Sequence, residues 1–419
     1  MKAPLPIKLA TGLAVAAILF TCILLRSRHM TDVLTRSPDE RTYTGNAALL
    51  ADEGFGVYRQ LFANYDASPD RWIYPSPTRF GHVLLFAAVM RATGVRDGRA
   101  GAATSWLFSV LSVALVAWMG LRFFHPAVAL FAAALMACSF GELGMARRAW
   151  QDATFGFCGL LMTCLACEIC RSPGRKGLYL ALLAAGAFSL LTKETSVLSY
   201  GLVLLWLAGV AVWESRWRRL FGVVATGAAS LALAVAVWVA LAGDARTALE
   251  SVVHSTRSAS GQWAQQYCSG PWYQFPYLLW IVGPLTAAAA LAGAGIALSL
   301  GWAKVSSHLA IADHRAAGLA AFVTLGFVCF ASFVPHLQYL RIVSPAAGSY
   351  CLLAGVGLWF LLSMAHRLMG KFGQYAAALA LGVAILVAGI HDYRSFTNVV
   401  VRSGMEELSV FGIRLVMNR

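Results

Sequence analysis

Long apolar segments separated by short polar strings run along almost the whole chain. A helix needs about 20 apolar residues to cross a hydrocarbon core of roughly 30 Å. Eleven segments approach that length and are predicted to span a membrane: 9–25, 101–121, 126–144, 153–170, 177–192, 195–213, 219–243, 275–300, 316–334, 343–363 and 372–390. The pattern therefore predicts an all-α polytopic membrane protein.

One apolar segment is too short to span. Residues 80–89 lie between Arg79 and Arg91 and are only ten in number. A segment of that length suits a helix lying in the membrane interface. We therefore place it within a first outer loop, residues 26–100, and expect a second large outer loop at 244–274.

The first apolar run follows Lys2 and Lys8, as the apolar part of a signal peptide also does. Signal peptides usually have a shorter apolar region that ends in an A-x-A cleavage site. The run from Leu9 to Leu25 is longer and has no clear site of this kind. We expect it to be retained as the first span of a membrane domain covering residues 1–391, with an outer tail at 392–419.

The composition agrees with a membrane protein, with 59% apolar residues, 12% charged residues and a mean hydropathy of +0.67. The net charge of +14 raises the question of nucleic-acid binding. That function needs Lys and Arg gathered on one face of a soluble fold. Here they lie in short strings between apolar runs, which argues against nucleic acid as a partner.

The basic strings instead predict the orientation, because cytoplasmic loops carry an excess of Lys and Arg. With the N-terminus inside, the inner loops contain Arg171, Arg175 and Lys176, and then Arg216, Arg218 and Arg219. Counting 80–89 as a span would place both strings outside. The interfacial prediction for 80–89 is therefore preferred, and it puts the large loops on the outer face.

The first outer loop contains Ser37-Pro38-Asp39-Glu40, followed by Tyr43. Ser37 or Asp39 can cap a helix in which Pro38 occupies the first turn. A carboxylate just outside the first span can also act as a general base towards an acceptor hydroxyl or amine. Residue types alone leave both interpretations open.

Farther along the same loop, Pro75 and Pro77 fix an extended turn before Arg79. Trp72 and Tyr74 in this turn are typical interface anchors. Anchoring and substrate contact both remain open for these two aromatic residues.

Three later motifs place charges at the mouths of predicted spans. Arg147 and Arg148 precede Asp152, Lys193 lies in the turn Leu191-Thr192-Lys193, and the segment from His336 to Arg341 includes Tyr339. Asp152 can serve as a helix cap and Lys193 can extend its amine to the interface. An Arg pair beside an Asp also resembles a phosphate clamp. Ionisable groups at the membrane edge are candidates for function.

The nine cysteines predict no disulfide framework, because most of them lie inside apolar runs. Cys164, Cys167 and Cys170 share one helical face, where thiols usually act as small packing residues. A metal site there lacks a fourth ligand nearby. We expect no metal or other cofactor, since no motif in the sequence supports a divalent cation.

Taken in order, these motifs resemble the membrane-embedded C-type glycosyltransferases, in particular the protein O-mannosyltransferases and the lipid A aminoarabinose transferases. The matching positions run over about residues 30–360: Asp39, Glu40 and Tyr43; Pro75 and Pro77; Asp152; Leu191, Thr192 and Lys193; and Arg341 with Pro345. One position departs from the aminoarabinose transferases, which carry Lys before the proline turn where this chain has Tyr74. Arg79 is a candidate for the missing cation.

The resemblance implies a transferase that moves a hexose or pentose from a polyprenyl-phosphate donor to a glycan, lipid or protein acceptor, with inversion. It implies that Asp39 is the catalytic base, that Asp152 shares its cavity, and that Lys193 and Arg341 contact the carrier phosphate. Glu40, Tyr43, Arg79, Arg148 and Tyr339 are expected to line the substrate site. The implied location is the bacterial inner membrane, with the site facing the periplasm.

Two other functions stay open on the sequence. A multi-pass transporter would suit eleven spans, although transporters usually show two related halves and broken helices near the midplane. An O-antigen ligase or polysaccharide polymerase would place its large loop late in the chain. The 244–274 loop, with His254 and Arg257, keeps that alternative open.

Overall fold

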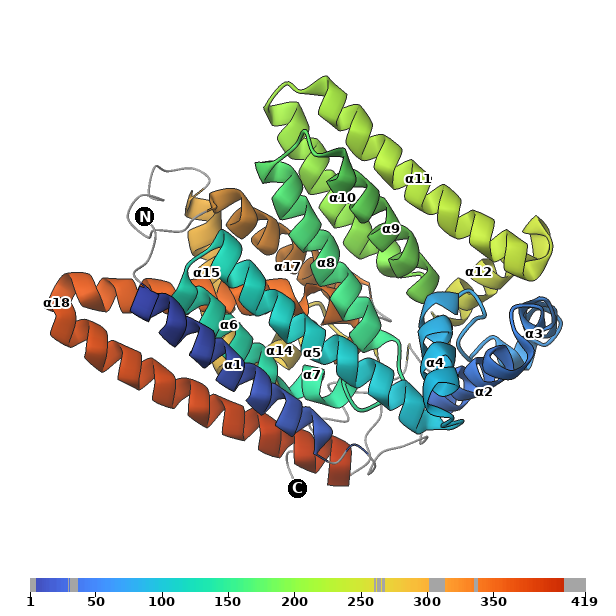
Figure 1. Ribbon diagram of the computed structural model, residues 1–419, viewed down its shortest axis with the longest axis horizontal. Coiled ribbons are helices and arrows are strands. Elements are labelled where there is room, and N and C mark those ends of the chain that lie inside the picture. Colours follow the sequence, from blue (N-terminus) through green and yellow to red (C-terminus); the bar gives the residue numbers. More distant parts are fainter. Residues whose placement is uncertain are drawn as a thin grey trace.

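The computed structural model describes residues 5–28, 30, 37–259, 261, 265, 268–300, 313–334 and 338–402. Over these residues the chain is helical and has no β-strand, which confirms the predicted all-α class. The long helices form a bundle, and several short helices lie together beside one end of it (Figure 1).

The bundle is built from helices with long apolar runs. Seven of the described helices are long and apolar enough to cross a membrane: α1 (Leu5–Ser27), α5 (Gly98–Phe123), α8 (Asp152–Arg171), α10 (Ser196–Trp213), α11 (Trp217–Ala242), α17 (His314–Phe333) and α18 (Ser344–Phe396). Three shorter apolar helices accompany them: α4 (Phe80–Thr93), α6 (Pro126–Cys138) and α9 (Lys176–Thr192). The chain is an integral membrane protein.

Two predicted spans are interrupted. The segment 275–300 divides into α14 (Gln274–Val282) and α15 (Pro284–Leu300), which meet at a bend of 120°. Pro284 explains the break, because proline has no N–H to continue the hydrogen-bond ladder. The predicted span 126–144 likewise ends early, since α6 stops at Cys138 and the short α7 (Phe140–Met145) follows.

The long helix α18 contains two predicted spans, 343–363 and 372–390. Its backbone leaves the helical region at Gly370, where φ is +64°. Glycine adopts this conformation without the steric cost that a side chain would add. The two halves of α18 therefore run in different directions (Figure 1), and the short η4 (Thr397–Arg402) continues the second half.

The first predicted loop is largely helical. It contains α2 (Pro38–Glu53), α3 (Val57–Asp66), η1 (Pro69–Arg71) and α4. The helix expected at 80–89 is confirmed as α4, which continues to Thr93. The second predicted loop contributes α12 (Ala245–Ala259), which packs against α3.

The antiparallel run of α8 to α11 defines two ends of the bundle. At one end α8 begins, α9 ends, α10 begins and α11 ends, and there α2, α3, α4 and α12 gather; we call this the α4 end (Figure 1). The opposite end carries the turns 172–175 and 214–216. Because α11 has 26 residues, it separates the two ends by about 39 Å at 1.5 Å per residue.

Close packing between α8 and α18 determines where the turn before α18 lies at the α4 end. A Cβ added at Gly159 of α8 would collide with Pro345, and one at Gly156 would meet the Ser344 backbone. These glycines let the start of α18 press against the first turns of α8. The turn η3 (Leu340–Val343), which directly precedes α18, is thereby held beside the beginning of α8.

Candidate active site

The cap of α2 is Ser37, so Asp39 is free for another role. The Ser37 Oγ accepts a hydrogen bond from the Asp39 amide at 3.2 Å. Glu40 completes a capping box by accepting from the Ser37 amide at 3.2 Å. Such reciprocal bonds satisfy two N–H groups that a helix start leaves open. The Asp39 carboxylate is not needed for the cap, and 31% of its side chain is exposed.

Glu40 ties α2 to the segment before α8. Its side chain is completely buried, pairs with Arg148, and accepts from the Ala149 amide at 2.9 Å. Arg148 is equally buried. A buried ion pair of this kind holds two segments in register, because removing one partner leaves an uncompensated charge. Glu40 and Arg148 therefore hold these two segments in position, and the substrate contact expected of them stays a prediction.

Four charged side chains from four separate elements meet at the α4 end: Asp39, Asp152, Lys193 and Arg341, here called the four-charge cluster. The Lys193 Nζ lies 2.7 Å from Asp152 Oδ1. The Arg341 Nη1 lies 3.7 Å from Asp152 Oδ2 and 3.9 Å from Asp39 Oδ2. The structure therefore brings together four residues that the sequence analysis assigned to one site, and their roles in that site stay predictions.

The members of the four-charge cluster differ in their access to solvent. Asp152 is fully buried and Lys193 has 7% of its side chain exposed, whereas Arg341 has 14% and Asp39 31%. Two carboxylates and two cations balance in formal charge. Arg341 lies between the carboxylates at distances longer than a charged hydrogen bond, which is typically about 2.7–2.9 Å.

An aromatic ring supports Arg341. The Arg341 Cζ and the Arg148 Cζ each lie 4.4 Å from the centroid of the buried Trp150 ring. Tyr339 adds a second ring 5.6 Å from the Arg341 Cζ. Cations over aromatic faces are stabilised by the ring quadrupole. Sequence reasoning assigned no role to Trp150, and its position directly after two arginines and an alanine was the available signal.

Arg79 belongs to a network next to the cluster. Its Nε lies 3.0 Å from Glu194 Oε2, and its Nη1 donates to the Tyr43 hydroxyl at 3.0 Å. Glu194 also accepts from the Thr78 hydroxyl and, at 3.4 Å, from that of Ser255. Arg79 is thus paired with an acidic residue that the sequence analysis did not single out.

The network sets the ionisation of its members. Burial opposes the charge on Glu194, but the Arg79 guanidinium and the Thr78 hydroxyl outweigh it and hold the pKa of that carboxyl below its ordinary value. Burial also raises the pKa of the Tyr43 hydroxyl. Tyr43 therefore stays neutral at physiological pH and can accept the hydrogen bond from Arg79. The expected substrate contact by Tyr43 and Arg79 stays a prediction.

A second residue missed by the sequence analysis is His82 on α4. It is fully buried, and its ring meets the Tyr43 ring edge-on at 5.2 Å. The Thr154 hydroxyl lies 3.5 Å from its Nδ1. Burial lowers the pKa of His82 to about 4, so this imidazole is neutral at physiological pH. Its neutral ring packs Tyr43 against α8.

One predicted anchor of the first loop, Trp72, contacts the second loop. Trp72 stacks on His254 of α12 with ring centroids 3.6 Å apart, and the His254 Nε2 lies 3.1 Å from Asp66 Oδ1. His254 therefore joins α12 to α3 and to the loop before α4. Tyr74 is partly exposed, and His336 lies outside the described residues.

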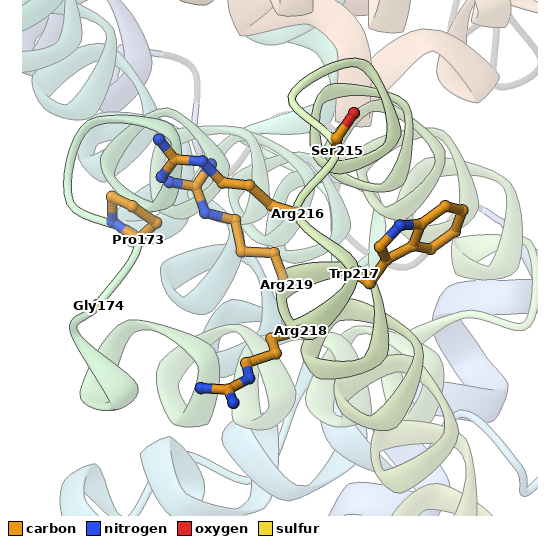
Figure 2. Close-up of a pocket in the computed structure, with 7 residues that line it drawn as sticks. All are labelled: Pro173, Gly174, Ser215, Arg216, Trp217, Arg218 and Arg219. Carbon is orange, nitrogen blue, oxygen red and sulfur yellow. The ribbon is translucent and has the colours of Figure 1, made fainter.

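Among the residues that the structure describes, no group of three or more His, Cys, Asp or Glu side chains is placed to hold a metal ion. Cys164, Cys167 and Cys170 are buried in α8 as packing residues. A hollow of about 570 Å³ lies elsewhere, at the opposite end of the bundle between residues 173–174 and 215–219 (Figure 2).

Comparison of the sequence with protein-family models and with curated proteins finds no match. Comparison of the fold with solved structures does find similar chains. ArnT from Cupriavidus metallidurans bound to undecaprenyl phosphate has a TM-score of 0.54 at 18% identity, covering 97% of this chain and 76% of that chain. Its apo state gives a TM-score of 0.51 over 97% and 78%.

The Archaeoglobus fulgidus oligosaccharyltransferase is similar as well. Its complex with Zn and sulfate has a TM-score of 0.58 at 12% identity, covering 92% of this chain and 53% of that chain. AglB from the same organism, with an inhibitory peptide and a dolichol-phosphate, gives 0.55 at 11% identity over 91% and 56%. At such identities the likeness concerns the fold, and this chain has the fold of the membrane-embedded C-type glycosyltransferases.

Proposed function

We propose that this protein is an inverting glycosyltransferase that moves a hexose or pentose from a polyprenyl-phosphate donor to an acceptor. The observation that carries the proposal is the four-charge cluster, which gathers a partly exposed carboxylate and two cations at one end of a membrane bundle. The fold supports it, since similar chains include ArnT bound to undecaprenyl phosphate and AglB with a dolichol-phosphate.

In this proposal Asp39 is the general base, because it is the more exposed of the two carboxylates. It takes the proton of the acceptor hydroxyl or amine while the acceptor atom bonds to the anomeric carbon from the face opposite the carrier. The bond between that carbon and the phosphate oxygen breaks, and its electron pair stays on the polyprenyl phosphate. Positive groups beside the leaving phosphate stabilise the negative charge that develops there.

Arg341 and Lys193 supply that positive charge, and each must change partner to do so. Before the donor binds, Lys193 is held by Asp152 at 2.7 Å, and Arg341 lies between Asp152 and Asp39. A phosphate offers stronger bidentate acceptors to a guanidinium than two distant carboxylates do. Donor binding would draw Arg341 away from Asp39 and leave that carboxylate without its cation, as a base requires.

The proposal includes a topology with eleven spans and a cytoplasmic N-terminus. The basic residues Arg122, Arg171, Lys176 and Arg218 all belong to the opposite end of the bundle. The positive-inside rule assigns that end to the cytoplasm. The four-charge cluster then faces the periplasm of a bacterial inner membrane, and α4 lies in the outer interface.

The direct test is a comparison of membrane lipids with and without the gene. We expect a polyprenyl-phosphate sugar to accumulate when the gene is deleted, and to return to its normal level with the wild-type gene but not with Asp39→Asn. Mass spectrometry of the lipid extract identifies the sugar and the carrier. An unchanged lipid pool in the deletion strain would overturn the proposal, whatever the acceptor.

A further inference from the structure

The hollow at the opposite end of the bundle is separate from the four-charge cluster. It measures about 570 Å³ and is lined by Pro173, Gly174, Ser215, Arg216, Trp217, Arg218 and Arg219 (Figure 2). Sites for small molecules typically have volumes of about 300–1,000 Å³. Since α11 separates the two ends by about 39 Å, a ligand of this hollow cannot take part in the transfer reaction.

The charges around the hollow are unbalanced. Glu214 pairs with Arg219 at 2.6 Å, with Arg216 at 3.3 Å and with Arg315 at 2.7 Å. No bond of the exposed Arg218 side chain is found among the described residues. Four arginines against one glutamate leave a formal excess of three positive charges at this place. An excess of this kind favours an anionic ligand.

Backbone N–H groups at two helix starts also favour an anion in the hollow. The helix α11 begins in the hollow, with Arg216 in its N-cap position, and α9 begins next to it at Lys176, after Arg175; neither helix start is capped by a side chain. Helix starts present free N–H groups and the positive end of the helix dipole. Figure 2 shows the Arg216 and Arg219 side chains extending toward Pro173, while Arg218 extends separately. Arg216 and Arg219 share Glu214 as a partner, and Arg218 is the arginine of the hollow that Glu214 does not bind.

The surroundings indicate that the anion is part of a lipid. Trp213 is 90% exposed, Trp217 60% and Phe221 72%. Exposed aromatic side chains beside arginines are typical of the membrane–water boundary. The hollow therefore opens where the headgroups of the leaflet lie.

We propose that this hollow binds the phosphodiester headgroup of an anionic phospholipid, held by Arg218, whose charge Glu214 does not offset, and by the starts of α9 and α11, with Arg216 and Arg219 adding to the positive field. Trp217 contacts the glycerol region of the lipid. The proposal is independent of the transferase activity, because it concerns the other end of the bundle.

The test is a lipid titration of the purified full-length protein in non-ionic detergent, followed by its melting temperature. Dihexanoyl phosphatidylglycerol should raise the melting temperature of the wild type, and dihexanoyl phosphatidylcholine should not. Arg218→Gln should weaken the apparent affinity for the anionic lipid about fivefold, as expected for one basic residue near a lipid surface. Arg71→Gln removes the same charge at the α4 end and should leave the titration unchanged.

Three results would overturn the proposal. The zwitterionic lipid could stabilise the protein as well as the anionic one. Inorganic phosphate at matched ionic strength could reproduce the whole effect, which would identify a free anion and not a lipid as the ligand. Finally, Arg71→Gln could weaken binding as much as Arg218→Gln, which would point to the net charge of the protein instead of this hollow.

Discussion

At the start of α2, the neighbouring carboxylates Asp39 and Glu40 have different surroundings, and only Glu40 is needed for the fold. Ser37 provides the cap and Glu40 is committed to Arg148, so Asp39 contributes little to the fold and has 31% of its side chain exposed. These neighbouring acids therefore have separable roles. Substituting each by its amide should separate catalytic loss from structural loss.

We expect Asp39→Asn to lower the transfer rate by about 10²- to 10⁴-fold, since an amide cannot accept the acceptor's proton. Its melting temperature should match the wild type. Asp52→Asn, an exposed change on the same helix, is the control and should transfer normally. Glu40→Gln should instead lower the melting temperature, because breaking a buried ion pair costs about 3–5 kcal/mol. Full activity of Asp39→Asn in normally inserted protein would remove the base assignment.

The two cations of the cluster should act on the donor. We expect Lys193→Ala and Arg341→Ala each to reduce the use of a polyprenyl-phosphate sugar, because each loses a charge-assisted bond worth about 1.5–3 kcal/mol, or roughly ten- to hundredfold. Arg341→Lys should restore little, since a point charge cannot replace a fork stacked on Trp150. Steady-state kinetics against donor concentration provide the measurement. Unchanged donor dependence in both alanine variants would contradict the phosphate contact.

At the level of elements, Glu194 joins the α9–α10 turn to the start of α4 through Arg79 and Thr78. Its folded-state pKa lies below the ordinary value, which is about 4.3. The ionised group therefore stabilises the fold above that pH, and this stabilisation is lost as the pH falls through the folded-state pKa. Lowering the pH should therefore weaken the contact between the α9–α10 turn and the start of α4.

Glu194→Gln tests this contact. At pH 7 the variant should melt below the wild type, and the difference should shrink as the pH falls below the ordinary carboxyl pKa of about 4.3, where the unfolded wild-type chain takes up a proton that the folded state still resists. Melting curves in detergent over a range of pH give the comparison, with the exposed Glu53→Gln as the control. A difference that stays constant down to pH 3 would show that ionisation of Glu194 does not stabilise the fold.

At the scale of the whole molecule, the proposed orientation in the membrane can be tested by labelling cysteines introduced at the two ends of the bundle. In a Cys329→Ser background, which removes the exposed native thiol, Ile73→Cys and Arg99→Cys lie at the α4 end with well-exposed side chains. Both should react with an impermeant thiol reagent on intact cells. Arg218→Cys should react only after lysis. Reaction of position 218 from outside would reverse the orientation.

The apolar runs predicted most of the architecture, because a membrane-spanning helix is specified locally by its length and composition. The breaks at Ser139 and Gly283 were missed, because the spans were assigned by apolar length alone; Pro284 was the available signal for the second break. Asp39, Asp152, Lys193 and Arg341 could be named because they interrupt apolar sequence at the ends of spans. Glu194 and His82 could not, because their roles arise from partners more than 70 residues away, and the contact of Trp150 with Arg341 likewise joins distant parts of the chain.

The ring of Trp150, shared by Arg148 and Arg341, has an evolutionary consequence. Without the ring, both guanidinium groups would lose the aromatic face beside them, although Glu40 would still pair with Arg148 and Asp152 would still lie near Arg341. A lineage that replaced this tryptophan by an aliphatic residue would weaken the support of both arginines at once, and a lineage that lost Arg341 would leave Arg148 alone on the ring. Positions 148, 150 and 341 should therefore be inherited as one unit, and an isolated change at any of them should be rare among functional descendants.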